Sequence, residues 1–103
     1  MAFAVIYRWE VEPGHEDYFR ERWHAGTLRL REEYGGLGSL LTRDAAGAFV
    51  AIALWPSEEA REKAFANRGP VDPWPGIVSF EETKLQVEDD LWKVSAFRDV
   101  AGA

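Results

Sequence analysis

The chain contains no cysteine and a single methionine, and it is short of positive charge. The missing cysteine excludes a disulfide-stabilised scaffold and any metal site with cysteine ligands. Lysine and arginine together number 12 against 18 aspartates and glutamates, which gives a net charge of -6. The basic residues form no cluster. A domain with this acidic balance is a poor candidate for binding nucleic acid or anionic lipid.

Long apolar segments are also missing. The opening residues have no basic stretch ahead of their apolar run, and they carry a charge at Arg8, unlike a secretory signal peptide. No apolar run approaches the roughly 20 residues that a membrane-spanning helix needs. We therefore expect a soluble, cytoplasmic protein with no membrane partner. At 103 residues the chain is predicted to be one domain, with a core over about 3–88 and a C-terminal arm over 89–103.

Six secondary-structure elements are predicted from the spacing of apolar residues. Alternation over two residues indicates strands, whereas steps of three and four indicate a helix. In chain order they are a strand over 2–11, a helix over 15–34, strands over 38–44 and 48–55 joined by a turn, a helix capped by Ser57 and running to about Asn67, and an extended segment over 77–88. The order β-α-β-β-α-β predicts an α+β, ferredoxin-like fold with an antiparallel sheet and both helices on one face.

The strand over 48–55 is apolar on both of its faces. Two helices cover only one face, so the other would be an exposed apolar patch. We therefore predict a homodimer that packs sheet against sheet, as a dimeric α+β barrel. The predicted interface residues are Ile6, Arg8, Val50, Ile52 and Leu54. In the alternative, a monomer, a C-terminal segment folds back over this face with Leu91, Trp92, Val94 and Phe97.

Aromatic residues are abundant, at 14% of the chain with five tryptophans. A domain this small cannot easily hide so many large rings in its own core. We predict that four rings on the helix-facing side line a pocket for a small apolar or aromatic ligand: Tyr7, Trp9, Trp23 and Trp55. The small side chains of Ala51 and Ala53 leave room beside them. The alternative is that these rings pack together as ordinary core.

Few residues are suited to acid–base chemistry in such a pocket. His24 lies on the predicted helix, about 100° around from Trp23, and is our candidate catalytic base. The alternative is an exposed surface histidine. His15 and His24 are not followed by a carboxylate at four residues, so we predict no metal site. Nucleophile elbows, phosphate-binding loops and dinucleotide-binding motifs do not occur in the sequence.

The predicted element order, the strand exit Y-R-W-E-V-E-P-G and the strand-to-helix segment L-W-P-S-E-E-A resemble antibiotic biosynthesis monooxygenase-like proteins over about residues 3–88. The resemblance implies a dimeric α+β barrel with a small-molecule pocket in each subunit. Characterised members of the family include oxygenases that oxidise phenolic polyketides without metal or flavin, and haem degraders. The resemblance therefore implies a cofactor-independent monooxygenase acting on an aromatic or polyketide-like molecule. The alternative is a non-catalytic dimeric binding or interaction domain on the same scaffold.

Individual positions refine this resemblance. Trp55 matches a tryptophan that lines the pocket of the polyketide oxygenases. Those enzymes have an asparagine where this chain has Ala51, so an amide that could hold dioxygen or a substrate oxygen is missing here. The haem degraders have an asparagine at the position of Tyr7 and a histidine after the second helix, whereas no histidine follows His24 in this chain. The resemblance therefore disfavours haem degradation.

Overall fold

The computed structural model describes residues 2–97, so residues 98–103 of the predicted arm lie outside the described part. The predicted order β-α-β-β-α-β is confirmed, and the observed ends lie close to the predicted ones. The elements are β1 (Phe3–Val11), α1 (Glu16–Glu33), β2 (Gly38–Arg43), β3 (Phe49–Trp55), α2 (Glu58–Arg68) and β4 (Ile77–Gln86).

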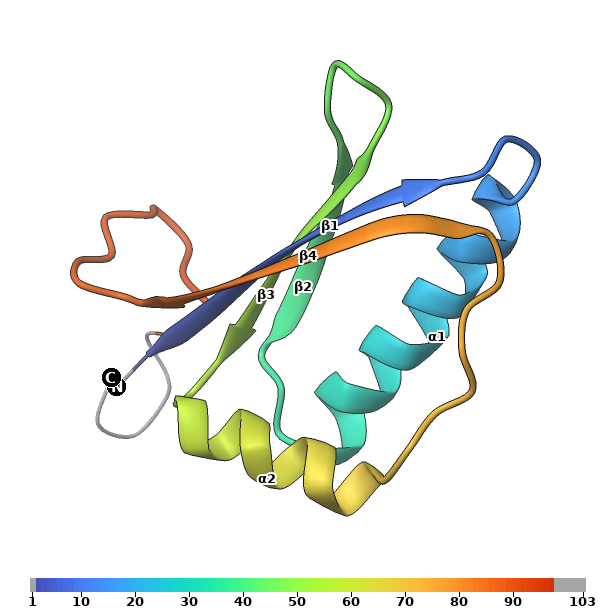
Figure 1. Ribbon diagram of the computed structural model, residues 1–103. Helices are drawn as coiled ribbons and strands as arrows, with labels where there is room; N and C mark the ends of the chain where they lie inside the picture. Colours follow the sequence, from blue (N-terminus) through green and yellow to red (C-terminus); the bar gives the residue numbers. More distant parts are fainter. Residues whose placement is uncertain (1, 98–103) are drawn as a thin grey trace.

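The four strands form one antiparallel sheet in the order β2-β3-β1-β4. Tyr7 in the middle of β1 lies opposite Ala51 of β3 and Glu82 of β4. In this register, the odd-numbered residues of β1 and β3 lie on the same face of the sheet as the even-numbered residues of β4. Both helices lie on that side of the sheet (Figure 1), which confirms the predicted ferredoxin-like arrangement.

The two helices begin in different ways. The Oγ atom of Ser57 accepts a hydrogen bond from the backbone N–H of Ala60 (3.0 Å), which confirms the predicted cap of α2. His15 stands at the cap position of α1, but its side chain makes no capping hydrogen bond. In the part of the chain that the structure describes, neither helix is long and apolar enough to span a bilayer.

The helix-facing side of the sheet holds two separate groups of buried apolar residues. The first lies against α2 and consists of Phe3, Val5, Trp55 and Ala64. The second lies against α1 and consists of Trp9, Phe19, Phe49 and Ala51. Tyr7 is only half-buried and packs against both groups. The core is therefore divided, and Tyr7 stands at the division.

The loop over 69–76 returns from α2 to β4 along the outside of this division. Its Trp74 ring stacks on Trp9, with 6.2 Å between ring centroids, and meets Phe19 edge-on. The guanidinium of Arg22 lies over the Trp74 ring (5.5 Å) and donates to the backbone carbonyl of Asp72 (3.0 Å). These contacts hold an otherwise irregular, proline-rich segment against α1.

The opposite side of the sheet, which we call the open face, carries the predicted interface residues. Ile6, Val50, Ile52 and Leu54 are half-buried there. Arg8 is half-buried as well, and it forms ion pairs with Glu10 (3.2 Å) and Asp44 (3.3 Å). Both carboxylate partners of Arg8 on this face belong to its own chain.

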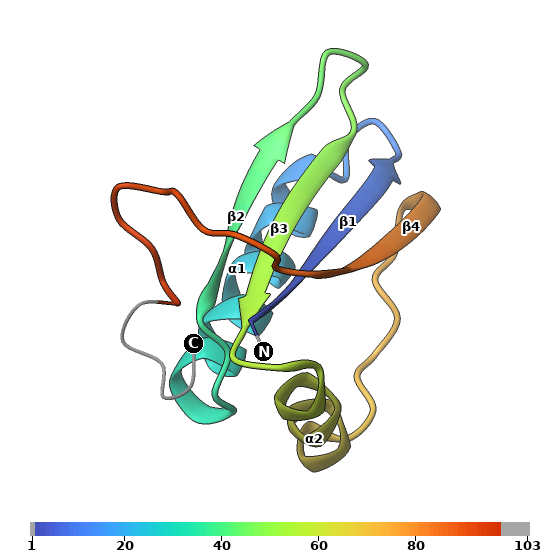
Figure 2. The ribbon, with the colours of Figure 1, turned by 90° about the vertical axis from the view of Figure 1, so that its left-hand side faces the viewer.

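The segment after β4 crosses the open face, away from the helices (Figure 2). Phe97 is buried, with 9% of its surface exposed. Leu91 and Val94 are 85% and 87% exposed, and Trp92 is exposed too. The segment therefore follows the path of the monomeric alternative, but three of its four apolar side chains do not cover the sheet as that alternative requires.

Candidate functional site

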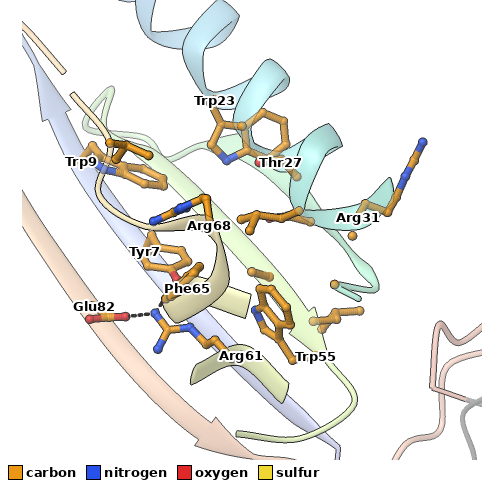
Figure 3. Close-up of a pocket in the computed structure, with 18 of the residues that line it drawn as sticks. Tyr7, Trp9, Trp23, Thr27, Arg31, Trp55, Arg61, Phe65, Arg68 and Glu82 are labelled. Atoms are coloured by element: carbon orange, nitrogen blue, oxygen red, sulfur yellow. Dashed lines mark hydrogen bonds and ion pairs between the residues drawn. The ribbon is translucent and has the colours of Figure 1, made fainter. Parts of the chain in front are cut away.

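A pocket of about 520 Å³ opens between the helix-facing side of the sheet, the two helices and the loop over 69–76 (Figure 3). Every strand and both helices contribute to its lining. The lining residues are Tyr7, Trp9, Trp23, Gly26, Thr27, Leu30, Arg31, Gly36, Gly38, Ser39, Ala53, Leu54, Trp55, Arg61, Phe65, Arg68, Val71, Trp74, Phe80 and Glu82. The divided core thus leaves a cavity large enough for a small organic molecule.

The structure brings the four predicted ring residues together around this pocket. Tyr7 and Trp9 lie two apart on β1, and their rings stack at 5.4 Å between centroids. Trp23 reaches the pocket from α1. Trp55 ends β3 and meets Phe65 of α2 edge-on at 5.8 Å. Flat aromatic faces therefore form the walls, as suits a planar apolar ligand.

The two alanines of β3 that were expected to leave room behave differently. Ala53 lines the pocket. Ala51 is fully buried within the core group around Trp9, Phe19 and Phe49, and it is absent from the lining among the described residues. Position 51 is therefore a packing position here.

One end of the pocket is polar. Arg61 projects from α2, and its Nη2 atom donates hydrogen bonds to the Tyr7 hydroxyl oxygen (2.7 Å) and to a carboxylate oxygen of Glu82 (Figure 3). Its guanidinium also lies 4.6 Å from the centre of the Phe65 ring. Arg61 is only 7% exposed, so its charge is held in the interior by this carboxylate and by aromatic faces.

The hydrogen bond from Arg61 determines what Tyr7 can do. Burial raises the pKa of Tyr7 above its ordinary value, although the hydrogen bond and positive charge of Arg61 act in the opposite direction. Tyr7 therefore stays protonated at neutral pH. Because Arg61 donates to the hydroxyl oxygen, the hydroxyl proton is free to be donated to another acceptor.

Two buried polar atoms in the pocket lining lack a hydrogen-bond partner among the described residues. They are Nε of Arg61 and Oγ of Ser39. Buried polar groups in folded proteins are almost always satisfied, so each such atom calls for a reason. Both belong to the lining of one cavity, and a ligand or solvent there would provide acceptors for them.

His24 is not positioned for its predicted role. It is exposed on α1 and is absent from the pocket lining among the described residues. It borders another hollow instead, together with Arg20, Glu21, Trp23 and Leu41. The physical reason is the helical rotation: with Trp23 turned toward the sheet, the next residue points away from the pocket. The structure therefore gives no support to His24 as a base acting in this pocket.

Sequence reasoning missed three of the pocket residues that matter most. Arg61 lies on the same face of α2 as Ala64 and Phe65, at spacings of three and four residues, and this pattern could have indicated it. Glu82 alternates with Phe80 on β4, but only the pairing with β1 places it beside Tyr7. Trp74 lies in an irregular loop, where no periodicity predicts a direction.

Metal-ligating side chains do not cluster in the described part of the chain. Over residues 2–97, no three histidine, aspartate or glutamate side chains gather in a way that would hold a metal ion.

Comparison with protein families gives a match over residues 2–69 to the family described as antibiotic biosynthesis monooxygenase. The matched part covers most of the chain. This chain belongs to the antibiotic biosynthesis monooxygenase family. No curated protein matches its sequence significantly.

Solved structures with the same fold include proteins of different described activities. SnoaB of Streptomyces nogalater, a cofactor-independent oxygenase solved as a mutant, aligns with a TM-score of 0.69 and 17% identity over 87% of this chain and 96% of its own. Rv0793 of Mycobacterium tuberculosis aligns with a TM-score of 0.71 and 19% identity, over 89% and 100%. The haem degrader MhuD of the same organism aligns with a TM-score of 0.66 and 21% identity, over 87% and 99%. At these identities the likeness establishes the family fold.

Proposed function

We propose that this protein is a cofactor-independent monooxygenase that acts on an aromatic or polyketide-like small molecule. The observation that carries the proposal is the pocket itself: flat aromatic walls along its length and a hydrogen-bonding group, the Tyr7 hydroxyl backed by Arg61, at one end. Membership of the family and the shared fold with an oxygenase support it. A planar substrate with one oxygen atom matches this division of apolar and polar surface.

Oxygenation without a cofactor requires the substrate itself to reduce dioxygen. A methylene group between two aromatic rings can lose a proton to give a stabilised anion, which passes electrons to O2. One oxygen atom then enters as a carbonyl, and the two methylene hydrogens leave with the other oxygen atom as water. The aromatic walls orient the rings and exclude water, and the Tyr7 hydroxyl donates to the substrate oxygen on which the negative charge develops.

The proposed working form is a homodimer in the cytoplasm. Its interface is the open face, with Ile6, Val50, Ile52 and Leu54 contributing apolar contact and with Arg8 paired to Glu10 and Asp44 of its own chain. A partner sheet packed on this face would remove the half-buried apolar side chains from water. The pocket lies on the other side of the sheet, so each subunit carries a complete one.

A non-catalytic binding domain is the second candidate, and Ala51 is the observation that favours it. The polyketide oxygenases that this chain resembles have an asparagine at this position, whereas Ala51 is buried in apolar packing here. Haem degradation is not part of the proposal. No histidine is found among the described residues that line the pocket, so the donor set does not suit haem iron held by a histidine.

Oxygen uptake distinguishes the two candidates. The protein is incubated with a panel of anthrone-type phenols while dissolved oxygen is recorded, and binding of each compound is followed by tryptophan fluorescence. We expect uptake above the buffer rate for at least one compound, and about a 10²–10³-fold lower rate for Tyr7→Phe. Tyr18→Phe is the matched control, because Tyr18 is exposed on α1 and its hydroxyl contacts only Arg22 among the hydrogen bonds found. Binding without uptake across the panel would leave the binding domain as the better description.

A further inference from the structure

The oxygenase proposal needs a group that removes a proton from the substrate, and His24 does not reach the pocket. The described lining residues offer few titratable alternatives: Tyr7, three arginines and Glu82. Arginine is always charged in proteins and has no acceptor atom. The Tyr7 hydroxyl stays protonated and its oxygen already accepts from Arg61. Glu82 is the carboxylate that remains.

We propose that Glu82 is the proton acceptor of this pocket, and that Arg61 holds the negative charge that the substrate gains when Glu82 takes its proton. This inference rests on the proposed function, because it supplies the base that the proposed reaction requires. It concerns residues of β4 and α2 that the sequence did not indicate.

The position of Glu82 follows from the sheet register. Glu82 on β4 lies directly opposite Tyr7 on β1, and residues paired across antiparallel strands point to the same side of the sheet. Glu82 therefore faces the helices, whereas its neighbour Glu81 lies opposite Arg8 in the strand register and faces the open side. The Glu82 side chain is 31% exposed, so its carboxylate is anchored by Arg61 and still open to the pocket and to solvent.

Arg61 contacts both groups that would act on the substrate. The same Nη2 atom donates to Glu82 and to the Tyr7 hydroxyl, which brings the proposed base and the proposed hydrogen-bond donor into one cluster. The Nε atom of Arg61 has no partner among the described residues. A substrate oxygen at this end of the pocket would therefore meet the Tyr7 proton and a guanidinium with an unused donor.

The proton transfer conserves charge at the site. Before transfer, the positive guanidinium is balanced by the Glu82 carboxylate. The substrate C–H bond breaks, its proton forms an O–H bond on Glu82, and the electron pair moves to the substrate oxygen as an enolate. Glu82 is then neutral and the enolate balances Arg61, so the buried guanidinium is never left without a negative partner. The charge that develops is met by donors already in place.

Hydrogen exchange without oxygen tests this step separately from oxygenation. Anthrone, a planar three-ring ketone with an acidic methylene group, is incubated anaerobically with the protein in D2O, and loss of its methylene proton signal is followed by NMR. We expect the wild-type protein to accelerate exchange. Glu82→Gln should lower the accelerated rate by about 10²–10⁴-fold, the usual contribution of a positioned base. Anthrone binding, measured by tryptophan fluorescence, should be retained.

Glu81→Gln is the matched control, since it makes the same change one residue away on the other face of β4. It should exchange at the wild-type rate. Equal rates for Glu82→Gln and Glu81→Gln would overturn the proposal, and so would a wild-type protein that binds anthrone without accelerating exchange. If circular dichroism shows that Glu82→Gln is unfolded, the exchange rate is measured for Glu82→Asp instead. This variant keeps the carboxylate but shortens the side chain by one methylene group, and an unchanged exchange rate would also overturn the proposal.

The two proposals fail in different ways. Exchange that depends on Glu82, with no oxygen uptake by the wild-type protein, would refute the monooxygenase and leave the proton acceptor in place. Oxygen uptake that is equally fast in wild type and Glu82→Gln would keep the monooxygenase and refute the role of Glu82.

Discussion

The two faces of this sheet use the same strands to make opposite kinds of surface. On the helix-facing side, β1 and β3 present large rings and small alanines, which leave a cavity between two separate core groups. On the open face, the same strands present four branched aliphatic side chains: Ile6, Val50, Ile52 and Leu54. Rings and alanines of unequal size leave space when a helix packs over them, whereas aliphatic rows give an even surface that a second sheet can cover.

Arg8 on the open face and Arg61 on the helix-facing side differ in what they leave available. Arg8 on the open face is paired with Glu10 and Asp44 of its own chain, so its guanidinium already has carboxylate partners there. Arg61 on the helix-facing side is paired with Glu82 but keeps an unused buried donor. A charge within an apolar surface can therefore be fully paired by its own chain, or can leave a donor at which a ligand binds.

Ile52→Asp is the change expected to have the largest effect on the open face. Ile52 lies at the centre of this face, opposite Ile6 of β1 and Leu40 of β2. An aspartate there would place an unpaired charge in the proposed interface, so we expect the dimer to dissociate. Light scattering coupled to size exclusion measures the outcome. Ala66→Asp on the exposed side of α2 is the control and should stay dimeric. A dimeric Ile52→Asp protein would show that this face is not the interface.

Trp55→Ala tests the helix-facing side. Trp55 is 2% exposed within the first core group, and truncation of a buried tryptophan costs about 3–5 kcal/mol of unfolding free energy. This loss should be the same at all protein concentrations, because Trp55 packs within one subunit. Ile52→Ala should lose stability by an amount that depends on concentration, since part of its burial comes from the partner. Urea unfolding at two protein concentrations distinguishes the two variants. The same concentration dependence in both would show that the two faces do not differ in this way.

Much of the fold could be predicted from local signals. Alternation along β1 and β3 gave the correct faces, and Ser57 gave the start of α2. Tyr7, Trp9, Trp23 and Trp55 were placed together because each lies on the core side of a strongly patterned element. Local periodicity decides such positions, since it fixes which side of an element is buried.

The polar end of the pocket could not be predicted in this way. Glu82 is one of several acids on a strand whose alternation is weak, and only its long-range pairing with β1 places it beside Tyr7. The spacing of Arg61 with Ala64 and Phe65 could have indicated its face of α2, but it could not show that the guanidinium meets Tyr7 and Glu82. His24 was favoured because a histidine is the usual base at neutral pH, but one step along a helix turns a side chain away from its neighbour, and His24 does not line the pocket.

Tyr7→Phe tests the hydrogen bond between Arg61 and Tyr7 at the polar end of the pocket. Removing the hydroxyl eliminates a hydrogen bond to a charged group, worth about 1.5–3 kcal/mol at neutral pH. Because the pKa of Tyr7 is raised by burial, the stability it contributes is fully present below the pKa of an unfolded tyrosine, near 10, and is lost as pH rises through the higher folded value. Wild type should therefore lose more stability between pH 9 and about pH 12 than Tyr7→Phe does, as urea unfolding measures. Tyr18→Phe should follow the wild type, and a wild type with no greater alkaline loss than Tyr7→Phe would contradict the raised pKa.

The smallest effect is expected at Asp44, beside Arg8 on the open face. Its carboxylate accepts from the backbone N–H groups of Ala48 and Ala46 and pairs with Arg8, and these contacts hold its pKa below the ordinary value, the Ala48 bond most strongly. The stability that Asp44 contributes is thus present above the ordinary aspartate pKa and is lost as pH falls through the lowered one.

Asp44→Asn keeps an oxygen for the backbone donors but loses the charge, so we expect it to unfold in urea with a weaker dependence on pH in the acid range. Glu10→Gln, which removes the other partner of Arg8, is the control, because no backbone N–H is found bonded to Glu10 in the described residues. If Asp44→Asn also weakens the dimer, the ion pair between Asp44 and Arg8 is part of the interface. If instead the dimer is unchanged and the pH dependence of unfolding equals that of the wild type, Asp44 stabilises neither the turn between β2 and β3 nor the open face.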